Sequence, residues 1–481
     1  MTHTSVRRIA VRNPRTGQTD CQVDALGVAE LSPLAARLRS AQVAWAAAGV
    51  ARRSAVLNAW TDALLAEPAS ILDALATDTG RHRLAGNELR ALGGMVAGNA
   101  AMASCALAEV PERPSVTPGI GVQAQLVPYG LVGVISPWNF PLLLSMLDTI
   151  PALLAGCAVL VKPSEVTPRF VAPLMASLRD FPELAGVLAI VTGDGQTGAA
   201  LIEQVDVVCF TGSVATGRTV GEACARRFIP AFLELGGKDP VIVLASADPA
   251  RAAAVLLRAS VQATGQACQS LERVYVDKRL ESAFLERLVA LADAVPLNYP
   301  DSHDGQVGPL IFARQAEIIA AQLADAVGKG ARILTGGQIE NHGGGLWLRP
   351  TVVTGVTHQM ALMTEETFGP VMPVMSFVSL DEAVHLANDS LYGLSAAVLG
   401  DEAEALAVAR RLNVGAVSIN DGALTTEVFD AEKNAFNLSG LGASRMGPSG
   451  LLRFLRKKAL LIQRGTPKDM SSLDEAKGTG P

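Results

Sequence analysis

A cysteine set among small residues is the strongest candidate nucleophile in this sequence of 481 residues. Cys268 ends the run Gly265-Gln266-Ala267-Cys268, and a cation, Arg273, follows five positions later. A thiolate is a strong nucleophile near neutral pH where its surroundings lower its pKa and leave it accessible. A lone cysteine among small residues is more often a buried hydrophobic residue, so this run needs partners before it indicates chemistry.

An amide and a carboxylate are the partners that such a thiol requires. Asn139 lies in the run Pro137-Trp138-Asn139-Phe140-Pro141, and Glu234 opens the run Glu234-Leu235-Gly236-Gly237-Lys238. A side-chain amide can donate a hydrogen bond to an oxyanion, and a carboxylate can act as a general base. Taken singly, Asn139 would be a turn residue and Glu234 the end of a strand. Together with Cys268 they indicate nucleophilic acyl chemistry.

Three further motifs complete a pattern that covers almost the whole chain. They are Lys162-Pro163-Ser164-Glu165, Phe210-Thr211-Gly212-Ser213 and Glu365-Glu366-Thr367-Phe368-Gly369-Pro370. In their order and separations, these motifs and the runs around Cys268, Asn139 and Glu234 closely resemble the aldehyde dehydrogenase superfamily. The resemblance extends from about residue 13 to residue 463.

The resemblance implies an NAD(P)-dependent oxidation of an aldehyde to its carboxylic acid. Cys268 would add to the aldehyde as a thiohemiacetal, whose oxyanion the Asn139 amide and the Cys268 backbone N–H would stabilise. Loss of hydride would leave a thioester, and Glu234 would activate the water that hydrolyses it. No metal is expected.

The resemblance also assigns residues to the dinucleotide. The expected cofactor-binding residues are Ser136, Trp138, Lys162, Glu165, Gly193, Gly212, Ser213, Leu235, Glu366 and Phe368. Lys162 matches a ribose-contacting lysine, and a carboxylate at Glu165 would bind both ribose hydroxyls and repel a 2′-phosphate. NAD is therefore expected as the cofactor, and NADP is less favoured. Glu366 and Phe368 match positions that hold the nicotinamide-side ribose and the ring.

A literal GxGxxG run, Gly193 to Gly198, follows one predicted strand. The usual dinucleotide fingerprint also requires an acidic residue about twenty positions later, but Ser213 stands there. The resemblance instead places the pyrophosphate beside Gly212 and Ser213, at the start of the next helix, where free backbone N–H groups favour an anion. Gly193 is expected on the adenosine side.

The substrate class is predicted from an apolar stripe. Phe140, Leu143, Leu144 and Leu147 recur at helical spacing on a segment that resembles the wall of the family's substrate tunnel. This stripe favours an aromatic or medium-chain aliphatic aldehyde, although core packing explains such a stripe equally well. A carboxylate-bearing semialdehyde is less favoured because residues 140–147 contain no arginine. It stays open, since loops near Phe429 and Phe436 could supply other contacts.

Two positions depart from the family pattern. Ala263 replaces an asparagine often found five residues before the nucleophile, and the run 438–447 lacks the glutamate that some members use as a second proton carrier. Glu234 is therefore expected to act alone. A CoA-acylating enzyme is the alternative reaction, disfavoured by the presence of Glu234. A catalytically silent scaffold or binding protein on the same fold is the alternative of another class.

The elements that must position these residues follow from the hydrophobic pattern. Short apolar runs at 132–136, 158–162, 187–192, 207–211 and 231–235 alternate with helical segments. This rhythm predicts an α/β fold with a doubly wound parallel sheet, whose ligands bind at the carboxyl ends of the strands. Helices are expected at 34–48, 54–65, 87–108 and 313–328.

The resemblance divides the chain into domains and places the active site in the cleft between two of them. A Rossmann-like NAD-binding domain is expected over 1–112 and 131–239, and an α/β catalytic domain over 240–437. A small β oligomerisation element is expected over 113–130 and 455–465, implying a homodimer or homotetramer. Residues 466–481 are expected to form a polar tail.

Composition limits the partners. A net charge of −6 and a charged fraction of 18% give no general attraction for nucleic acid or an anionic membrane. Six cysteines without CxxC spacing argue against disulfides and a zinc site, and favour the reducing cytoplasm. The N-terminus has no apolar signal region. Residues 141–161 are apolar over about the length of a membrane span, but Asp148 and Pro151 favour a buried helix and strand.

Overall fold

A six-stranded sheet forms the first half of the computed structural model, which describes residues 7–475. Its order is β21-β9-β8-β5-β6-β7, and all strands except β21 run parallel. The strands are β5 (Leu131–Ile135), β6 (Ala158–Lys162), β7 (Leu188–Ile190), β8 (Val207–Thr211), β9 (Ala231–Glu234) and β21 (Gly440–Leu441). The predicted doubly wound sheet is confirmed. The predicted strand 187–192 is shorter because Val187 ends a helix, α7 (Pro182–Val187).

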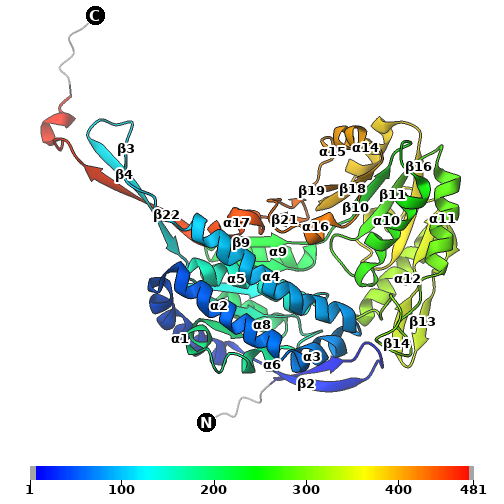
Figure 1. The fold of residues 1–481 in the computed structure, drawn as a ribbon, viewed down its shortest axis with the longest axis horizontal. Helices are drawn as coiled ribbons and strands as arrows, with labels where there is room; N and C mark the ends of the chain where they lie inside the picture. Colours follow the sequence, from blue (N-terminus) through cyan, green and yellow to red (C-terminus); the bar gives the residue numbers. More distant parts are fainter. Residues whose placement is uncertain (1–6, 476–481) are drawn as a thin grey trace, which may run out of the picture.

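Helices cover this sheet and supply most of its core (Figure 1). They are α1 (Val28–Ala47), α2 (Gly49–Ala66), α3 (Ala69–Thr79), α4 (His82–Ala106), α5 (Pro141–Ala155), α6 (Val171–Ala176), α8 (Gly195–Ile202), α9 (Val214–Arg226) and α17 (Gly447–Leu452). The three helices predicted in the first hundred residues are present, but α3 and a hairpin of β1 (Arg7–Arg12) and β2 (Thr19–Ala25) were not predicted. The N-terminal residues 1–6 and residues 476–481 of the predicted tail lie outside the described part.

The apolar segment after Asn139 forms the buried helix and strand that its composition predicts. Helix α5 begins with a proline, which is favoured at that position, and ends at Gly156 with a φ of +98°. Strand β6 follows, buried along its whole length. Between Arg7 and Glu475, no helix combines the length and the apolarity that crossing a membrane demands.

A seven-stranded sheet forms the second half, with the order β12-β15-β16-β11-β10-β18-β19. Its strands are β10 (Asp239–Val243), β11 (Leu271–Asp277), β12 (Arg332–Thr335), β15 (Thr351–Thr354), β16 (Val371–Phe377), β18 (Ser395–Leu399) and β19 (Ala416–Ile419). Alternate residues of β10 face two separate cores, with Ile242 in one and Val241 and Val243 in the other. Both faces of this sheet are therefore covered.

The remaining elements surround the second sheet. They are α10 (Pro249–Val261), η1 (Gln262–Gly265), α11 (Glu281–Asp293), α12 (Ala313–Gly328), β13 (Ile339–His342), β14 (Gly345–Leu348), α13 (Ala361–Thr364), α14 (Leu380–Asn388), β17 (Tyr392–Gly393), α15 (Glu402–Ala409), α16 (Leu424–Glu427) and β20 (Phe436–Asn437). The short helix η2 (Met470–Leu473) lies apart from this sheet, near the C-terminal end of the described chain (Figure 1). Helix α12 has the bounds predicted from the sequence.

A third, antiparallel sheet projects from the body as an arm (Figure 1). It contains β3 (Arg113–Pro114), β4 (Ile120–Pro128) and β22 (Leu455–Gln463), in the order β22-β4-β3. Strand β22 pairs with β4 along its full length, from Leu455 opposite Pro128 to Gln463 opposite Ile120. The pairing of residues 121–127 with a strand near the C-terminus is therefore confirmed.

Candidate active site

The three candidate catalytic residues line one cavity of about 460 Å³. Asn139 comes from the turn after β5, Glu234 from the end of β9, and Cys268 from the turn between η1 and β11. The cavity thus draws on both large sheets. The residues of the predicted apolar wall line it as well, namely Phe140, Leu143, Leu144 and Leu147.

The turn that carries Cys268 has an unusual backbone. Ala263, Thr264 and Gly265 all have left-handed φ values, of 55°, 62° and 67°. A Cβ atom at Gly265 would lie 2.3 Å from the carbonyl carbon of Gly369, so only glycine fits there. The Thr264 hydroxyl holds the turn by accepting a hydrogen bond from Gly308 N at 3.0 Å. Such backbone conformations persist only where the surroundings enforce them.

Arg81 connects this turn to the turn that carries Asn139. Its guanidinium donates hydrogen bonds to the backbone oxygen of Ala263 at 2.8 Å and to that of Asn139 at 2.6 Å. Burial lowers the pKa of Arg81 to about 10, and the charge of Glu88 opposes this shift. Position 263, where the sequence departs from the family pattern, therefore contributes through its backbone. No motif in the sequence indicates this role of Arg81.

The Asn139 side chain is fixed by the cysteine turn. It is buried, and its Nδ2 donates to the backbone oxygen of Gln266 at 3.0 Å. Since an amide nitrogen carries two hydrogens, one remains for another acceptor. Asn139 is therefore placed to donate into the cavity beside Cys268.

Glu234 has the electrostatic surroundings of a base. Burial raises its pKa, and the charges of Arg445 and Arg453 oppose that rise. A carboxylate with a raised pKa accepts a proton more readily near neutral pH. The antiparallel pairing of Gly440 with Glu234 brings the altered C-terminal run directly beside this residue.

Arg273, the cation five residues after Cys268, makes its hydrogen bonds away from the thiol. Its guanidinium is buried and donates to the backbone oxygens of Lys238, Leu386 and Ala387, the last two in α14. Arg273 therefore fastens the end of a helix, because its donors are used by carbonyl groups. Burial and the carboxylates of Glu366, Asp239 and Glu234 raise the pKa of Cys268 to about 12, and Arg445 opposes this rise.

Two cations that the sequence did not predict line the cavity, Lys433 and Arg445. Arg445 pairs with Asp148 of α5, with Nη2 and Oδ2 2.7 Å apart, and Asp148 also pairs with Arg453. Lys433 Nζ donates to the backbone oxygen of Thr425 at 2.5 Å. Arg445 lies in the altered run 438–447 and Lys433 lies just before it. Only the fold brings their side chains to the site.

The residues assigned to the dinucleotide follow the carboxyl ends of the parallel strands. The Lys162 ammonium at the end of β6 lies 3.2 Å from the Glu165 carboxylate, which is partly exposed. The Ser136 hydroxyl after β5 hydrogen-bonds with that of Ser145 at 2.6 Å. These are the strand ends at which a doubly wound sheet binds ligands.

Helices α8 and α9 differ in the group that accepts hydrogen bonds from the backbone N–H groups of their first turn. At α8, Asp194 accepts from Gln196 N at 2.9 Å and pairs with Arg7 at 2.7 Å, so a carboxylate already caps the GxGxxG segment. At α9, the cap is a neutral hydroxyl, that of Ser213. A Cβ at Gly212 would lie 2.6 Å from the Phe210 ring. The start of α9 is therefore the better site for a pyrophosphate.

Of the remaining assigned residues, Leu235 and Glu366 lie at the turn after β9, while Gly193 follows β7. Glu366 accepts from Gly237 N at 3.0 Å, and burial raises its pKa to about 8. The Phe368 ring, whose residue has a φ of +53°, lies 5.3 Å from that of Trp138. Leu235 lines the cavity, whereas Gly193 lies so close to Thr197 that a Cβ would meet its hydroxyl at 2.2 Å.

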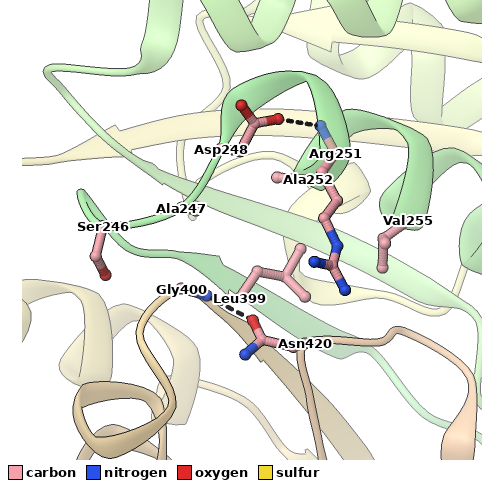
Figure 2. Close-up of a pocket in the computed structure, with 9 residues that line it drawn as sticks. All are labelled: Ser246, Ala247, Asp248, Arg251, Ala252, Val255, Leu399, Gly400 and Asn420. Atoms are coloured by element: carbon pink, nitrogen blue, oxygen red, sulfur yellow. Dashed lines mark hydrogen bonds between the residues drawn. The ribbon is translucent and has the colours of Figure 1, made fainter.

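A second cavity, of about 180 Å³, lies between the start of α10 and the ends of β18 and β19 (Figure 2). Asp248 caps α10 there by accepting from Arg251 N at 2.7 Å, and Asn420 accepts from Gly400 N at 2.9 Å. The residues that line it include none of those predicted for catalysis or cofactor binding.

Comparison with known proteins shows similarity over nearly the whole chain. A model described as "Aldehyde dehydrogenase family" matches residues 1–460. The "Putative succinate-semialdehyde dehydrogenase [NADP(+)]" of Mycolicibacterium smegmatis is 35% identical, over 89% of this chain and 84% of that protein. "Vanillin dehydrogenase" of an Amycolatopsis species is 36% identical, over 95% of this chain and 93% of that protein.

Solved structures agree with these relatives. The "Putative Aldehyde Dehydrogenase PutA from Anabaena variabilis" is 53% identical, with a TM-score of 0.94 over 96% of this chain and 99% of that chain. An "NAD-dependent aldehyde dehydrogenase from Sinorhizobium meliloti" is 29% identical, with a TM-score of 0.90 over 96% of this chain and 93% of that chain.

Proposed function

Because the chain belongs to the aldehyde dehydrogenase family, we propose that Cys268, Asn139 and Glu234 catalyse the oxidation of an aldehyde to its carboxylic acid through a thioester on Cys268. The observation that carries this proposal is the single cavity that these three side chains share. They come from three separate turns that the fold brings together.

The residues perform the reaction in two stages. The Cys268 thiolate attacks the carbonyl carbon, and the free Asn139 amide hydrogen and the Cys268 backbone N–H stabilise the resulting oxyanion. A nicotinamide dinucleotide held by the residues after the strand ends would supply the hydride acceptor, and loss of hydride from the oxyanion re-forms the carbonyl as a thioester on Cys268. Glu234 then removes a proton from water, whose oxygen attacks the thioester carbon, and the thiolate leaves as the acid is released.

The residues after the strand ends fit a nicotinamide dinucleotide. The N-terminus of α9, with Gly212 and Ser213, suits the pyrophosphate, while Lys162 and Glu165 suit a ribose. The expectation that NADP is the poorer cofactor is not supported, because relatives are named with NADP(+) as well as with NAD. We propose that Glu165 sets the balance, so that Glu165→Gln raises kcat/KM with NADP relative to NAD.

The substrate proposal rests on the apolar wall that Phe140 and α5 give the cavity. Phe140, Leu143, Leu144 and Leu147 give the cavity an apolar side, which suits an aromatic or medium-chain aliphatic aldehyde. The similarity to a vanillin dehydrogenase supports this class. A semialdehyde is the second candidate, because Lys433 and Arg445 also line the cavity and because another relative is named for succinate semialdehyde. Rates with succinate semialdehyde and its methyl ester separate the two candidates.

A single assay tests the reaction. Appearance of the reduced cofactor is followed by absorbance with a panel of aldehydes, with NAD or NADP, and with or without CoA. We expect turnover without CoA and none in Cys268→Ala. Equal rates in Cys268→Ala would contradict the mechanism, a requirement for CoA would indicate an acylating enzyme, and no turnover with any aldehyde would revive a non-catalytic scaffold.

A further inference from the structure

Lys433 differs from the other cation of the catalytic cavity in having no carboxylate within ion-pair distance among the described residues. Among the residues between Arg7 and Glu475, the cations that line the cavity are Lys433 and Arg445, and Arg445 is held by Asp148 at 2.7 Å. The interactions of the Lys433 ammonium are with neutral groups, the Thr425 carbonyl and the Gln269 side chain. A half-buried ammonium without a direct ion-pair partner is costly, unless an anion forms beside it.

Lys433 is linked to the nucleophile through Gln269, the residue that follows Cys268. Hydrogen bonding orients the Gln269 amide so that its nitrogen donates to Thr425 at 2.9 and 3.0 Å and its oxygen accepts from Lys433 Nζ at 3.3 Å. Gln269 directly follows Cys268 in the chain. An ammonium has three donors, and these contacts use two of them, which leaves one for the cavity.

We propose that the positive charge of the Lys433 ammonium stabilises the thiolate of Cys268. Lys433 would thus act through the nucleophile, by raising the fraction of Cys268 that is ionised. This inference rests on the proposed role of Cys268 as nucleophile. No residue type in the run around Cys268 supplies this charge, because Arg273 is committed to backbone carbonyls elsewhere. Lys433 lines the same cavity as Cys268, from the loop between α16 and β20.

The balance of charges around Cys268 explains why such a cation is needed. The charged groups that act on the thiol come from β9, β10, the loop after α13, the run before α17 and the loop before β20: Glu234, Asp239, Glu366, Arg445 and Lys433. The three carboxylates and burial oppose the thiolate, and Arg445 shares its charge with Asp148. Burial lowers the pKa of Lys433, and the charges of Cys268 and Glu234 are the leading groups that oppose this.

Alkylation of the thiol tests the proposal without aldehyde or cofactor. In this reaction the thiolate sulfur displaces iodide from iodoacetamide, so the rate reports the thiolate population. The full-length chain and the variants Lys433→Met, Lys433→Gln and Lys433→Arg are treated across a pH series, and modified Cys268 is quantified by peptide mass spectrometry. Cys268→Ser identifies the labelled peptide, which separates it from those of the exposed Cys105 and the part-buried Cys21.

We expect Lys433→Met and Lys433→Gln to slow alkylation of Cys268 roughly tenfold near pH 7.5 and to move its pH profile upward by about one unit. Lys433→Arg, which keeps the charge, should stay within about threefold of wild type. Lys433→Gln keeps a hydrogen-bond donor to Thr425, so a matching effect in both neutral variants assigns it to charge.

Two results would overturn the proposal. One is an unchanged alkylation profile in both neutral variants while circular dichroism and melting match wild type. The other is an unchanged profile accompanied by a selective loss of anionic aldehydes against their methyl esters, which would make Lys433 a substrate-binding residue. A chain that oxidises no aldehyde would contradict the proposed function, yet the alkylation profile would still decide the role of Lys433.

Discussion

Glu234 lies in the same cavity as the thiol, but its proposed work comes after the thiol has reacted. We predict that Glu234→Gln keeps a first burst of reduced cofactor and loses the steady state, because glutamine cannot take a proton from the hydrolytic water. The steady-state rate should fall about 10²- to 10⁴-fold, the usual contribution of a general base. Rapid mixing of enzyme, aldehyde and cofactor measures both phases. A steady state equal to wild type would remove Glu234 from deacylation.

The pH dependence of that step follows from the direction of the pKa shift. Burial raises the pKa of Glu234 above its ordinary value, so the base is lost by protonation at a higher pH than for an exposed glutamate. We predict that the steady-state rate falls as the pH drops through this raised pKa, while the initial burst of Glu234→Gln shows no such limb. A pH series of both phases checks this, and the same acidic limb in the burst of Glu234→Gln would assign it to another group.

At the scale of single residues, sequence motifs predicted the groups that could react but not their electrostatic partners. Cys268, Asn139 and Glu234 stood in recognisable runs, and the fold brings them into one cavity. Arg273 follows Cys268 by five residues, yet its guanidinium donates to backbone carbonyl groups, because nearness along the chain does not fix where a side chain points. Lys433 could not be predicted, since only the fold carries its loop to the cysteine turn.

At the scale of elements, the cysteine turn depends on one glycine. We predict that Gly265→Ala destabilises the protein by about 2–3 kcal/mol, because the residue is left-handed and its new Cβ would overlap the Gly369 backbone. We also expect kcat to fall by more than the loss of folded protein explains, because this turn carries the nucleophile. Denaturant unfolding and kcat measure the two effects.

Gly94 in α4 provides the matched control for that substitution. No atom lies within 4 Å of a Cβ placed there, so Gly94→Ala should be neutral or stabilising by about 0.5–1 kcal/mol, as alanine is in a helix. If Gly265→Ala and Gly94→Ala had the same unfolding free energy and the same kcat, the turn would tolerate a side chain at position 265, and the prediction would be wrong.

A buried carboxylate of α4, that of Glu88, caps the N-terminus of α5. Glu88 accepts hydrogen bonds from Leu142 N and Leu143 N, both at 3.1 Å, and burial raises its pKa to about 7 from 4.5. A group with a raised folded-state pKa stabilises fully below its unfolded pKa and loses that contribution as the pH rises through the folded value. We predict that wild type loses of the order of 3 kcal/mol from Glu88 between about pH 4.5 and 7.

Glu88→Gln isolates this contribution, because glutamine keeps an acceptor for the two N–H groups and does not ionise. Denaturant midpoints of wild type and Glu88→Gln should converge at low pH and separate towards pH 7, with the variant the more stable. Asp62→Asn, at an exposed position, serves as the control. Parallel pH profiles for wild type and Glu88→Gln would contradict the prediction.

Elements were predicted best where burial is continuous. The strands around Val134 and Val161 read as unbroken apolar runs because both faces of a parallel sheet are covered. The β1–β2 hairpin escaped prediction, since its strands are largely polar and only Val11 and Ala25 are buried. Short helices such as α3 lay within a helical texture that gave no clear boundary.

At the scale of the whole molecule, the active site depends on contacts between the two large sheets and their helices. Arg81 at the start of α4 holds the backbone of Asn139 from one half and that of Ala263 from the other. The sequence placed the catalytic residues on different units and so predicted a site between them. It could not predict the clamp, because each of its partners is a backbone oxygen, which no residue type marks.

The projecting arm is the feature of the whole molecule that a second copy would complete. Strand β22 is an edge strand whose side chains are mostly exposed, and Leu461 is 71% exposed. An unpaired strand edge that exposes apolar side chains is a ready site for association, so we predict a homodimer or homotetramer in which this arm contacts another subunit. Leu461→Asp should shift the protein to smaller species, measured by light scattering after size exclusion.

Val378→Asp, at a site 79% exposed and distant along the chain from the arm, should leave the assembly unchanged. A monomeric wild type, or an assembly that Leu461→Asp does not weaken, would exclude this role for the arm.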